Sequence, residues 1–350
     1  MTPTERMRVA ARSVRAPWAR LPDEQLLAMR FCDLKLAIER SPVAPHIKRL
    51  YVDLERRGIG IRPHVWLAEE WFSPDGVPGI AVPFYLAHPR LERLERRIMR
   101  EAEGGNTRLL RRILRHEAGH ALDNAYRLRR RKRWRAAFGP ASSPYPARYR
   151  ARPGSRRYVH HLGEWYAQAH PTEDFAETFA VWLSPRSAWR RSYAGWPALH
   201  KLQAVDELVA ELRGRRPPVR NRARIEPLES NTRTLAQHYR RRLAHNRQIR
   251  RGLADELLRR AFSPRRSPRQ GLRAATLLRE ELRPRIPAIA RALGMERYSV
   301  EQVLRMVIER SERLRLYVRG NRREALRCSR ALLERLTRIY SEGETPQLPL

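Results

Sequence analysis

Apolar residues recur at helical intervals over most of the chain. A helix buries one face through residues three and four apart, so this spacing is the primary signal for helices. Before residue 200 it predicts five of them: two within 23–57, and one each at 91–99, 107–128 and 171–183. Beyond residue 222 the pattern is almost wholly helical, and one continuous helix is expected over 235–257.

Local signals mark where the helices predicted over 107–128 and 171–183 begin and end. Asn106 or Thr107 can cap the helix over 107–128, because their side chains accept hydrogen bonds from the N–H groups of the first turn. Pro171 suits the first position of the next helix, and Pro185 disfavours the α conformation in the residue before it.

One part of the chain has β-branched and aromatic residues instead. Two such runs, 65–72 and 77–86, flank the turn signal Ser73-Pro74-Asp75-Gly76. Strand-like runs joined by a short turn of these residues predict a β-hairpin. Pro83 confines the second run to the edge of a sheet.

These elements predict an α+β protein with three parts. Residues 1–22 form a basic N-terminal arm, 23–212 a domain with a small mixed sheet, and 213–345 an all-α C-terminal domain whose role the sequence does not reveal. The last boundary rests on the Arg- and Pro-rich stretch 213–222, which has the composition of a linker. Within the C-terminal domain, Ser299 and Gln302 predict a capping box.

Composition narrows the class of protein. The 350 residues contain no run of the ~18 to 20 apolar residues that a membrane-spanning helix needs, and the first 20 residues lack the apolar centre of an export signal. We therefore expect a soluble, cytoplasmic protein. Its only cysteines, Cys32 and Cys328, exclude a disulfide framework, a four-cysteine zinc ribbon and an iron–sulfur cluster. A metal ion would have to be held by histidine and carboxylate.

The chain is strongly basic, with 73 Lys and Arg against 37 Asp and Glu and a formal charge of +36. Such a surface attracts phosphates and acidic proteins. Only four of the basic residues are lysines, and the arginines run along the whole chain instead of collecting in one module. Nucleic acid therefore stays an open partner but is not favoured, and a general attraction to acidic partners is the preferred interpretation.

One string carries the candidate chemistry: His116-Glu117-Ala118-Gly119-His120. Residues four apart share one face of a helix, so both imidazoles can bind one ion while Glu117 stands beside the open coordination position. This is the HExxH arrangement of zinc hydrolases. The alternative, two surface histidines on a basic helix, is less favoured because residues 109–125 can bury one face.

A catalytic zinc needs a third protein ligand and keeps its fourth position for water. No histidine lies close behind the motif, so this ligand must come from farther along the chain. The candidates are His160, His161, His170, Glu164, Glu173, Asp174 and Glu177. Glu173 and Glu177 fit best, because they share one face of the helix predicted at 171–183. One can bind the metal while the other orients a ligand histidine.

The strings resemble a known family. His116 to Asp123, then Tyr166, then Glu173-Asp174-Phe175-Ala176-Glu177-Thr178-Phe179 is similar to the catalytic domain of the anthrax lethal factor-like metallopeptidases, in the gluzincin group of zincins. The resemblance covers about residues 115–183 and implies a zincin-like metallopeptidase domain. The same strings also resemble bacterial zinc-binding peptidases, for which no substrate is implied.

The resemblance implies a role for each residue of the site. His116, His120 and Glu173 would bind Zn²⁺, Glu117 would be the general base, and Glu177 would support a ligand through a hydrogen bond.

Three further expectations concern the surroundings of the metal. The family's catalytic tyrosine precedes its glutamate ligand by seven residues, where this chain has Tyr166; it would stabilise the oxyanion, or else simply pack with Trp165. Asp123 would support a ligand or accept a structural hydrogen bond. A protein or peptide substrate would add as a strand to the edge at Gly79–Leu86.

Two other functions fit parts of the sequence. SprT-like proteases, which act on DNA-bound proteins, also carry HExxH, but they take a nearby downstream histidine as third ligand and often contain a four-cysteine ribbon, and this chain has neither. A catalytically inactive zincin-fold protein, binding RNA or a partner through its C-terminal helices, is less favoured because every expected catalytic residue type is present.

Overall fold

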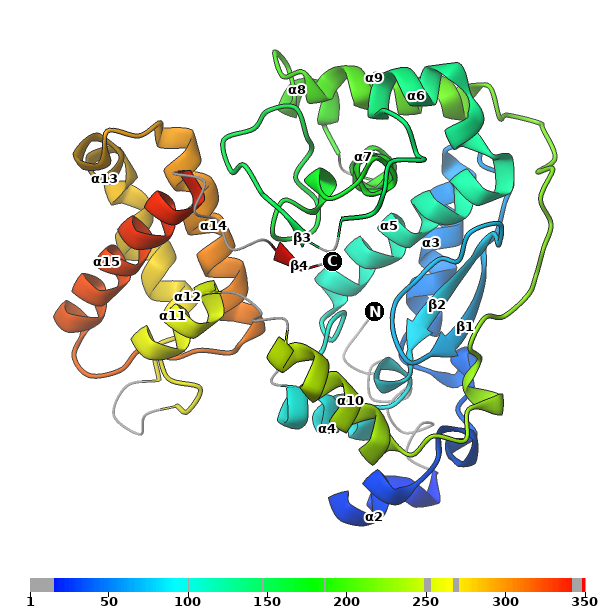
Figure 1. Ribbon diagram of the computed structural model, residues 1–350, viewed down its shortest axis with the longest axis horizontal. Coiled ribbons are helices and arrows are strands. Elements are labelled where there is room, and N and C mark those ends of the chain that lie inside the picture. The colour runs from blue at the N-terminus through cyan, green and yellow to red at the C-terminus, as the bar shows by residue number, and fades with distance from the viewer. Residues whose placement is uncertain are drawn as a thin grey trace. The chain divides into compact units, whose positions relative to one another are not determined.

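The chain forms two compact units (Figure 1). The computed structural model describes residues 16–99, 101–146, 148–185, 187–248, 253–266, 271–341 and 348–349. The first unit comprises Met1–Ser143 and Pro171–His245, and the second comprises Pro144–His170 and Asn246–Leu350. The second unit thus includes residues 144–170, the later part of the segment that separates the two predicted motif helices in the sequence. The predicted domain boundaries at 22, 212 and 345 separate parts that would fold independently. The division into compact units does not test independent folding, so these boundaries stay a prediction.

The first unit consists of helices and a small two-stranded sheet. The strands are β1 (His64–Ala68) and β2 (Gly79–Pro83). The α-helices are α2 (Asp23–Ala28), α3 (Ala44–Arg56), α4 (Pro89–Met99), α5 (Thr107–Tyr126), α6 (Lys132–Phe138), α7 (Pro171–Leu183), α8 (Trp189–Ser192), α9 (Ala198–Ala210) and α10 (Leu235–Gln248). Short 3-10 helices span Pro17–Arg20, Phe31–Leu34, Ile38–Arg40, Phe84–Ala87, Leu128–Arg130 and Leu228–Ser230. This architecture is α+β, as predicted.

The predicted hairpin is wrong, because β1 and β2 pair in parallel, with Val65 opposite Ile80. The turn signal is real, but it reverses the chain between Phe72 and Ala81 instead of between the two strands. There the N–H of Ala81 donates to the carbonyl of Phe72 (2.8 Å) in a single antiparallel pair. Phe72 therefore lies along one edge of β2, and β1 lies along the other.

The predicted substrate edge needs the same correction. Gly79–Pro83 is buried, and at Ala81 it is paired on both sides. From Phe84 the chain leaves the strand as a 3-10 helix. Pro83 is tolerated because it is the last residue of the strand. The run 79–86 is therefore not a free edge over its whole length.

The predicted linker 213–222 runs over the surface of the first unit. The carbonyl of Arg215 accepts a hydrogen bond from the Tyr126 hydroxyl (3.0 Å), and the N–H of Val219 donates to the carbonyl of Ala125 (3.1 Å). Farther on, the indole N–H of Trp66 donates to the carbonyl of Ile225 (3.0 Å). These contacts hold the stretch against α5 and β1.

A polar cluster anchors α10 to the end of β1. The carboxylate of Glu69 accepts hydrogen bonds from His238 Nδ1 (2.5 Å), Asn231 Nδ2 (2.7 Å) and Arg233 Nη1 (2.6 Å). Burial raises the pKa of Glu69, but the hydrogen bond and charge of His238, with the other partners, lower it to about 2.

We expect the contribution of Glu69 to stability to disappear in acid. Its folded-state pKa of about 2 lies below the ordinary value of 4.5, so the stabilisation is complete above pH 4.5 and is lost as the pH falls toward 2. The shift corresponds to roughly 3 kcal/mol. Between pH 6 and pH 3, urea unfolding midpoints should fall less for Glu69→Gln than for the wild type. Glu70→Gln, at an exposed neighbour, is the control and should behave like the wild type. Equal pH dependence in the wild type and Glu69→Gln would contradict this assignment.

Helices also dominate the second unit. They are α11 (Leu253–Ala261), α12 (Ala274–Leu277), a π-helical turn Leu278–Leu282, α13 (Ile286–Leu293), α14 (Arg297–Arg313) and α15 (Arg322–Ser341), with 3-10 turns at Tyr166–Gln168 and Arg283–Arg285. Two two-residue strands also belong to this unit, β3 (Arg148–Tyr149) and β4 (Leu348–Pro349), and they pair antiparallel. Both lie outside 213–345, the range predicted to be all-α. Tyr149 and Trp165 belong to the same apolar core as the C-terminal helices.

Of two helix predictions for the C-terminal region, one is wrong and the other stays untested. The capping box at Ser299 is wrong, because α14 already begins at Arg297 and Ser299 lies inside it. The continuous helix over 235–257 appears as α10 and α11, and residues 249–252 between them lie outside the described ranges. Its continuity therefore stays a prediction.

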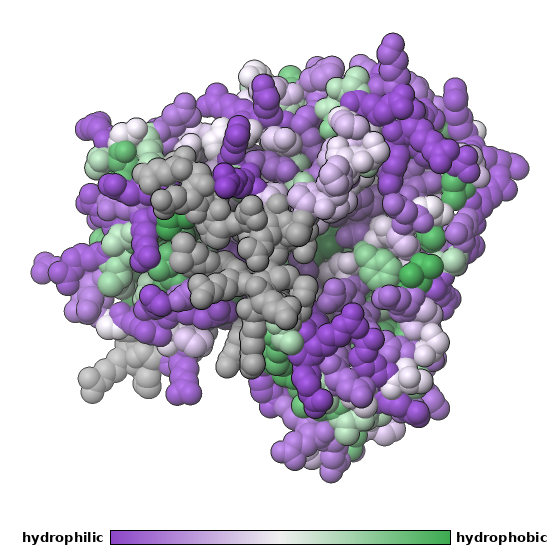
Figure 2. All heavy atoms as spheres, in the orientation of Figure 1, coloured by the Kyte–Doolittle hydropathy of each residue, from purple (hydrophilic) through white to green (hydrophobic). Residues whose placement is uncertain are grey.

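The predicted basic arm is described only from residue 16 onward. Trp18 is buried there, and its indole N–H donates to the carbonyl of Leu34 (3.0 Å). Hydrophilic side chains cover most of the coloured surface in Figure 2. Among the described helices, none combines the length and the apolar character that crossing a bilayer requires.

Candidate metal centre

α5 carries the HExxH string through the interior of the first unit. As predicted, Asn106 caps the helix, its side chain accepting a hydrogen bond from the N–H of Leu109 (2.8 Å). The helix contacts α3, α7 and β2. His116 and Glu117 are only 3% and 7% exposed. Polar side chains are seldom this buried without hydrogen-bond partners or a bound ion, so their burial indicates a specific polar site.

Close packing brings α7 against α5. α7 begins at Pro171, as predicted. The crossing is possible because Gly119 has no side chain: a Cβ there would lie 2.9 Å from Cα of Ala176 and 3.2 Å from Cδ1 of Phe179. The distance between the helices also sets the distance from Glu173 to the two histidines. Gly119 therefore contributes to the site without contributing an atom to it.

We expect Gly119→Ala to weaken metal binding by about tenfold or more, because α7 must move away and metal sites tolerate only ~0.5 Å of displacement. The fold should suffer less, because overpacking costs about 1–3 kcal/mol while alanine gains about 1 kcal/mol in helix propensity. Competition with a chromophoric chelator measures the affinity. Gly60→Ala, where nothing lies within 4 Å of the added methyl, is the control. Unchanged zinc affinity in Gly119→Ala would disprove the spacer role.

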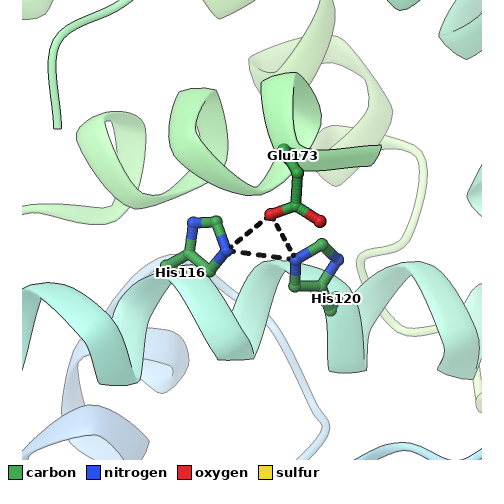
Figure 3. Close-up of side chains that lie close together, drawn as sticks. All are labelled: His116, His120 and Glu173. Carbon is green, nitrogen blue, oxygen red and sulfur yellow. Dashed lines mark hydrogen bonds and ion pairs between the residues drawn. The ribbon is translucent and has the colours of Figure 1, made fainter. Parts of the chain in front are cut away.

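Three ligand atoms converge where the helices meet (Figure 3). Nε2 of His116 lies 3.0 Å from Oε2 of Glu173, Nε2 of His120 lies 3.3 Å from the same oxygen, and the two Nε2 atoms are 3.1 Å apart. Ligands held ~2.1 Å from one ion in tetrahedral geometry are roughly 3.4 Å from one another. Within the described ranges, no other group of three His, Cys, Asp or Glu side chains converges in this way. Two imidazoles and one carboxylate are the donor set of a catalytic zinc site with an open position, so the residues fit that ion.

Glu177 holds His116 in the orientation that a metal ligand needs. Its Oε1 lies 3.0 Å from Nδ1 of His116, so Nδ1–H donates to the carboxylate and Nε2 is left to face the other two ligands. Burial lowers the pKa of His116, but hydrogen bonds to Glu173 and Glu177 raise it well above its ordinary value. Burial raises the pKa of Glu173, but the two histidines hold it well below its ordinary range. Zinc and a proton therefore compete for this site.

Sequence reasoning missed the partner of Glu117. The hydroxyl of Ser73 lies 2.9 Å from Oε2 of Glu117 and 3.3 Å from its backbone carbonyl. In the sequence, Ser73 belongs to a turn signal 44 residues earlier, and nothing in that signal indicates a partner. Ser73 reaches α5 only because the chain pairs Phe72 with Ala81 at the edge of β2.

Of the remaining candidate ligands, Asp174 is in the first unit and the others are in the second. Asp174 faces away from the histidine pair toward Lys201, whose Nζ lies 2.5 Å from Oδ2, and burial raises the pKa of Asp174 to about 7. His160 is in the second unit, with Nε2 2.8 Å from the Tyr298 hydroxyl. Glu164, His161 and His170 are also in the second unit.

Asp123 and Tyr166 were both expected near the metal. Asp123 is buried and accepts hydrogen bonds from the backbone N–H (2.8 Å) and Nε (2.6 Å) of Arg129. Its support of a metal ligand stays a prediction. Tyr166 opens a 3-10 helix in the second unit, with its ring edge-on to Tyr149 at 6.4 Å between centroids. Its catalytic role stays a prediction.

Comparison with known proteins gives one match. Neither the curated proteins nor the solved structures contain a counterpart to the chain. Residues 90–196, which include α5 and α7, match a family described as "Putative zinc-binding metallo-peptidase". The match and the geometry agree on the same part of the chain: it is similar to a family of zinc-binding metallopeptidases, and it carries a His116, His120 and Glu173 group that could hold a metal ion.

Proposed function

We propose that the protein is a zinc-dependent metallopeptidase of the gluzincin type, which hydrolyses peptide bonds in a protein or peptide. The convergence of His116, His120 and Glu173 carries the proposal, together with the buried Glu117 next to His116 on α5. The family match of residues 90–196 supports the same class of reaction. The likeness of the motifs to the anthrax lethal factor-like peptidases supports the finer assignment of ligands.

Each residue of the site has a task in this proposal. Bound zinc would polarise the substrate carbonyl and lower the pKa of its water toward ~7. Glu117 takes the proton of the attacking water and delivers it to the departing nitrogen, so the C–N bond breaks with a neutral amine as leaving group. Glu177 keeps His116 in the required tautomer.

Tyr166 would donate a hydrogen bond to the oxyanion in the transition state. We expect Tyr166→Phe to lower kcat by about 100-fold, with KM and zinc content near those of the wild type, because the hydroxyl acts only as charge develops. Tyr317→Phe is a matched control, since that ring lies under the Arg273 guanidinium and outside the segment 144–170. Undiminished turnover of Tyr166→Phe would leave the residue a packing role alone.

The proposal is tested on the purified full chain by metal analysis and a cleavage assay with a peptide library. We expect one zinc per chain and hydrolysis that a chelator abolishes and added zinc restores. A protein that binds zinc stoichiometrically but cleaves nothing would instead be the inactive zincin-fold binding protein. Cleavage that requires added DNA would favour the SprT-like function.

A further inference from the structure

We propose that Ser73 is a positioning residue for the general base: its hydroxyl holds the Glu117 carboxylate in the orientation that proton transfer requires. The inference rests on the proposed function of the site. It starts from the 2.9 Å separation between Ser73 Oγ and Glu117 Oε2. A serine hydroxyl has one proton, and the charged oxygen is both the nearer and the stronger of its two acceptors on Glu117.

The loop that carries Ser73 is fixed on both sides. Before it, the carbonyl of Phe72 accepts the N–H of Ala81 at the edge of β2 (2.8 Å). After it, Asn124 donates from Nδ2 to the carbonyl of Pro74 (3.0 Å) and accepts at Oδ1 from the N–H of Gly76 (3.1 Å). Such double anchoring leaves Ser73 little freedom to move.

Asn124 also explains why this loop lies over Glu117 in particular. The two residues are seven positions apart on α5, which is about two helical turns, so they share a face. Arg129 ties the arrangement together, with Nη1 2.8 Å from Asp75 of the loop and Nε 2.6 Å from Asp123 of the helix. The buried Asp123 thus acts on the loop through Arg129.

The bond has a consequence for the base. A glutamate side chain has three rotatable bonds, and a base must stay within about 0.5 Å of its productive position. Ser73 occupies Oε2 and leaves Oε1 to accept the proton. Ser73 therefore reduces the number of orientations of Glu117 without competing for the atom that reacts.

The test compares Ser73→Ala, Ser73→Thr and Ser230→Ala in the full zinc-loaded chain. Ser230 is a matched control, because among the described contacts its hydroxyl donates to the carbonyl of Pro227, in an exposed turn. We expect Ser73→Ala to lower kcat about tenfold, the order of one charge-assisted hydrogen bond, while KM and zinc affinity change less than twofold. Ser73→Thr keeps the hydroxyl and should recover most of kcat.

A double variant separates positioning from a merely structural role. If Ser73 acts through Glu117, then Ser73→Ala should cost nothing further in the Glu117→Gln background. An equal loss in both backgrounds, or wild-type kcat in Ser73→Ala, would overturn the proposal.

A crystallographic readout remains informative even if the wild type cleaves no peptide, an outcome that would count against the proposed function alone. In that experiment Glu117 should have one conformation in the wild type and several in Ser73→Ala. One conformation in both would overturn the positioning role.

Discussion

Replacement of Glu117 by glutamine is expected to lower kcat by about 100- to 10,000-fold while leaving zinc bound. Glutamine has the shape of glutamate, and its side-chain oxygen can still accept the Ser73 hydrogen bond. It cannot take a proton from water at neutral pH, and general-base assistance contributes a factor of this size. Glu117 is not one of the three converging ligands, so the metal content should stay at one ion per chain.

The comparison needs kcat on a peptide substrate and zinc by elemental analysis. Glu55→Gln is a suitable control, because that side chain is 72% exposed and its described ion pair is with the exposed Arg62 at 3.9 Å. It should show wild-type kcat and zinc. A Glu117→Gln enzyme as fast as the wild type would remove Glu117 from the mechanism, and one without zinc would show that the residue supports the metal instead.

Replacement of Glu173 by glutamine is expected to cost both the metal and the activity. The residue supplies the only carboxylate among the three converging ligands, and therefore the only negative charge in the donor set. Loss of an outer-shell partner alone typically costs 10- to 100-fold in affinity, so loss of a direct anionic ligand should exceed about 100-fold. Turnover should fall in proportion to the zinc lost.

Zinc affinity by chelator competition and turnover at saturating zinc are the two measurements. Glu207→Gln on α9 is the control, since its exposed carboxylate pairs only with Arg133 (3.1 Å) among the described contacts. Full zinc content in Glu173→Gln at submicromolar free zinc would mean that another group completes the site. Partial recovery of turnover by excess zinc would agree with the ligand assignment.

Local chemistry made part of this molecule predictable. The start of α5 at the Asn106 cap and the start of α7 at Pro171 depend on atoms within one turn of the chain, so the sequence is sufficient to place them. The convergence of His116 and His120 follows from the helical repeat in the same way. Glu173 and Glu177 could be proposed together because they share one face of a single helix.

Strand pairing could not be predicted in this way. The turn at residues 73–76 was correctly recognised, but whether it joins β1 to β2 or returns Phe72 to β2 depends on which edge of β2 each segment occupies. That choice is made by packing between segments nine to fifteen residues apart, and both arrangements have the same local pattern. The start of α14 was also misplaced: the capping box at Ser299 is a start signal, but the helix already begins at Arg297, two residues earlier.

The sequence by itself determined the kind of chemistry: with two cysteines, a metal ion has to rest on histidine and carboxylate, and helical spacing brings those groups together in pairs. The tertiary structure alone decided which pairs meet. The absence of a side chain at Gly119 lets α7 approach, which brings the Glu173 carboxylate within 3.0 Å of one histidine, and the clamped loop sets Ser73 on Glu117. Contacts between segments about 40 to 60 residues apart depend on how whole helices and strands pack together. The hydrophobic pattern within one helix or strand does not show which other element it will contact.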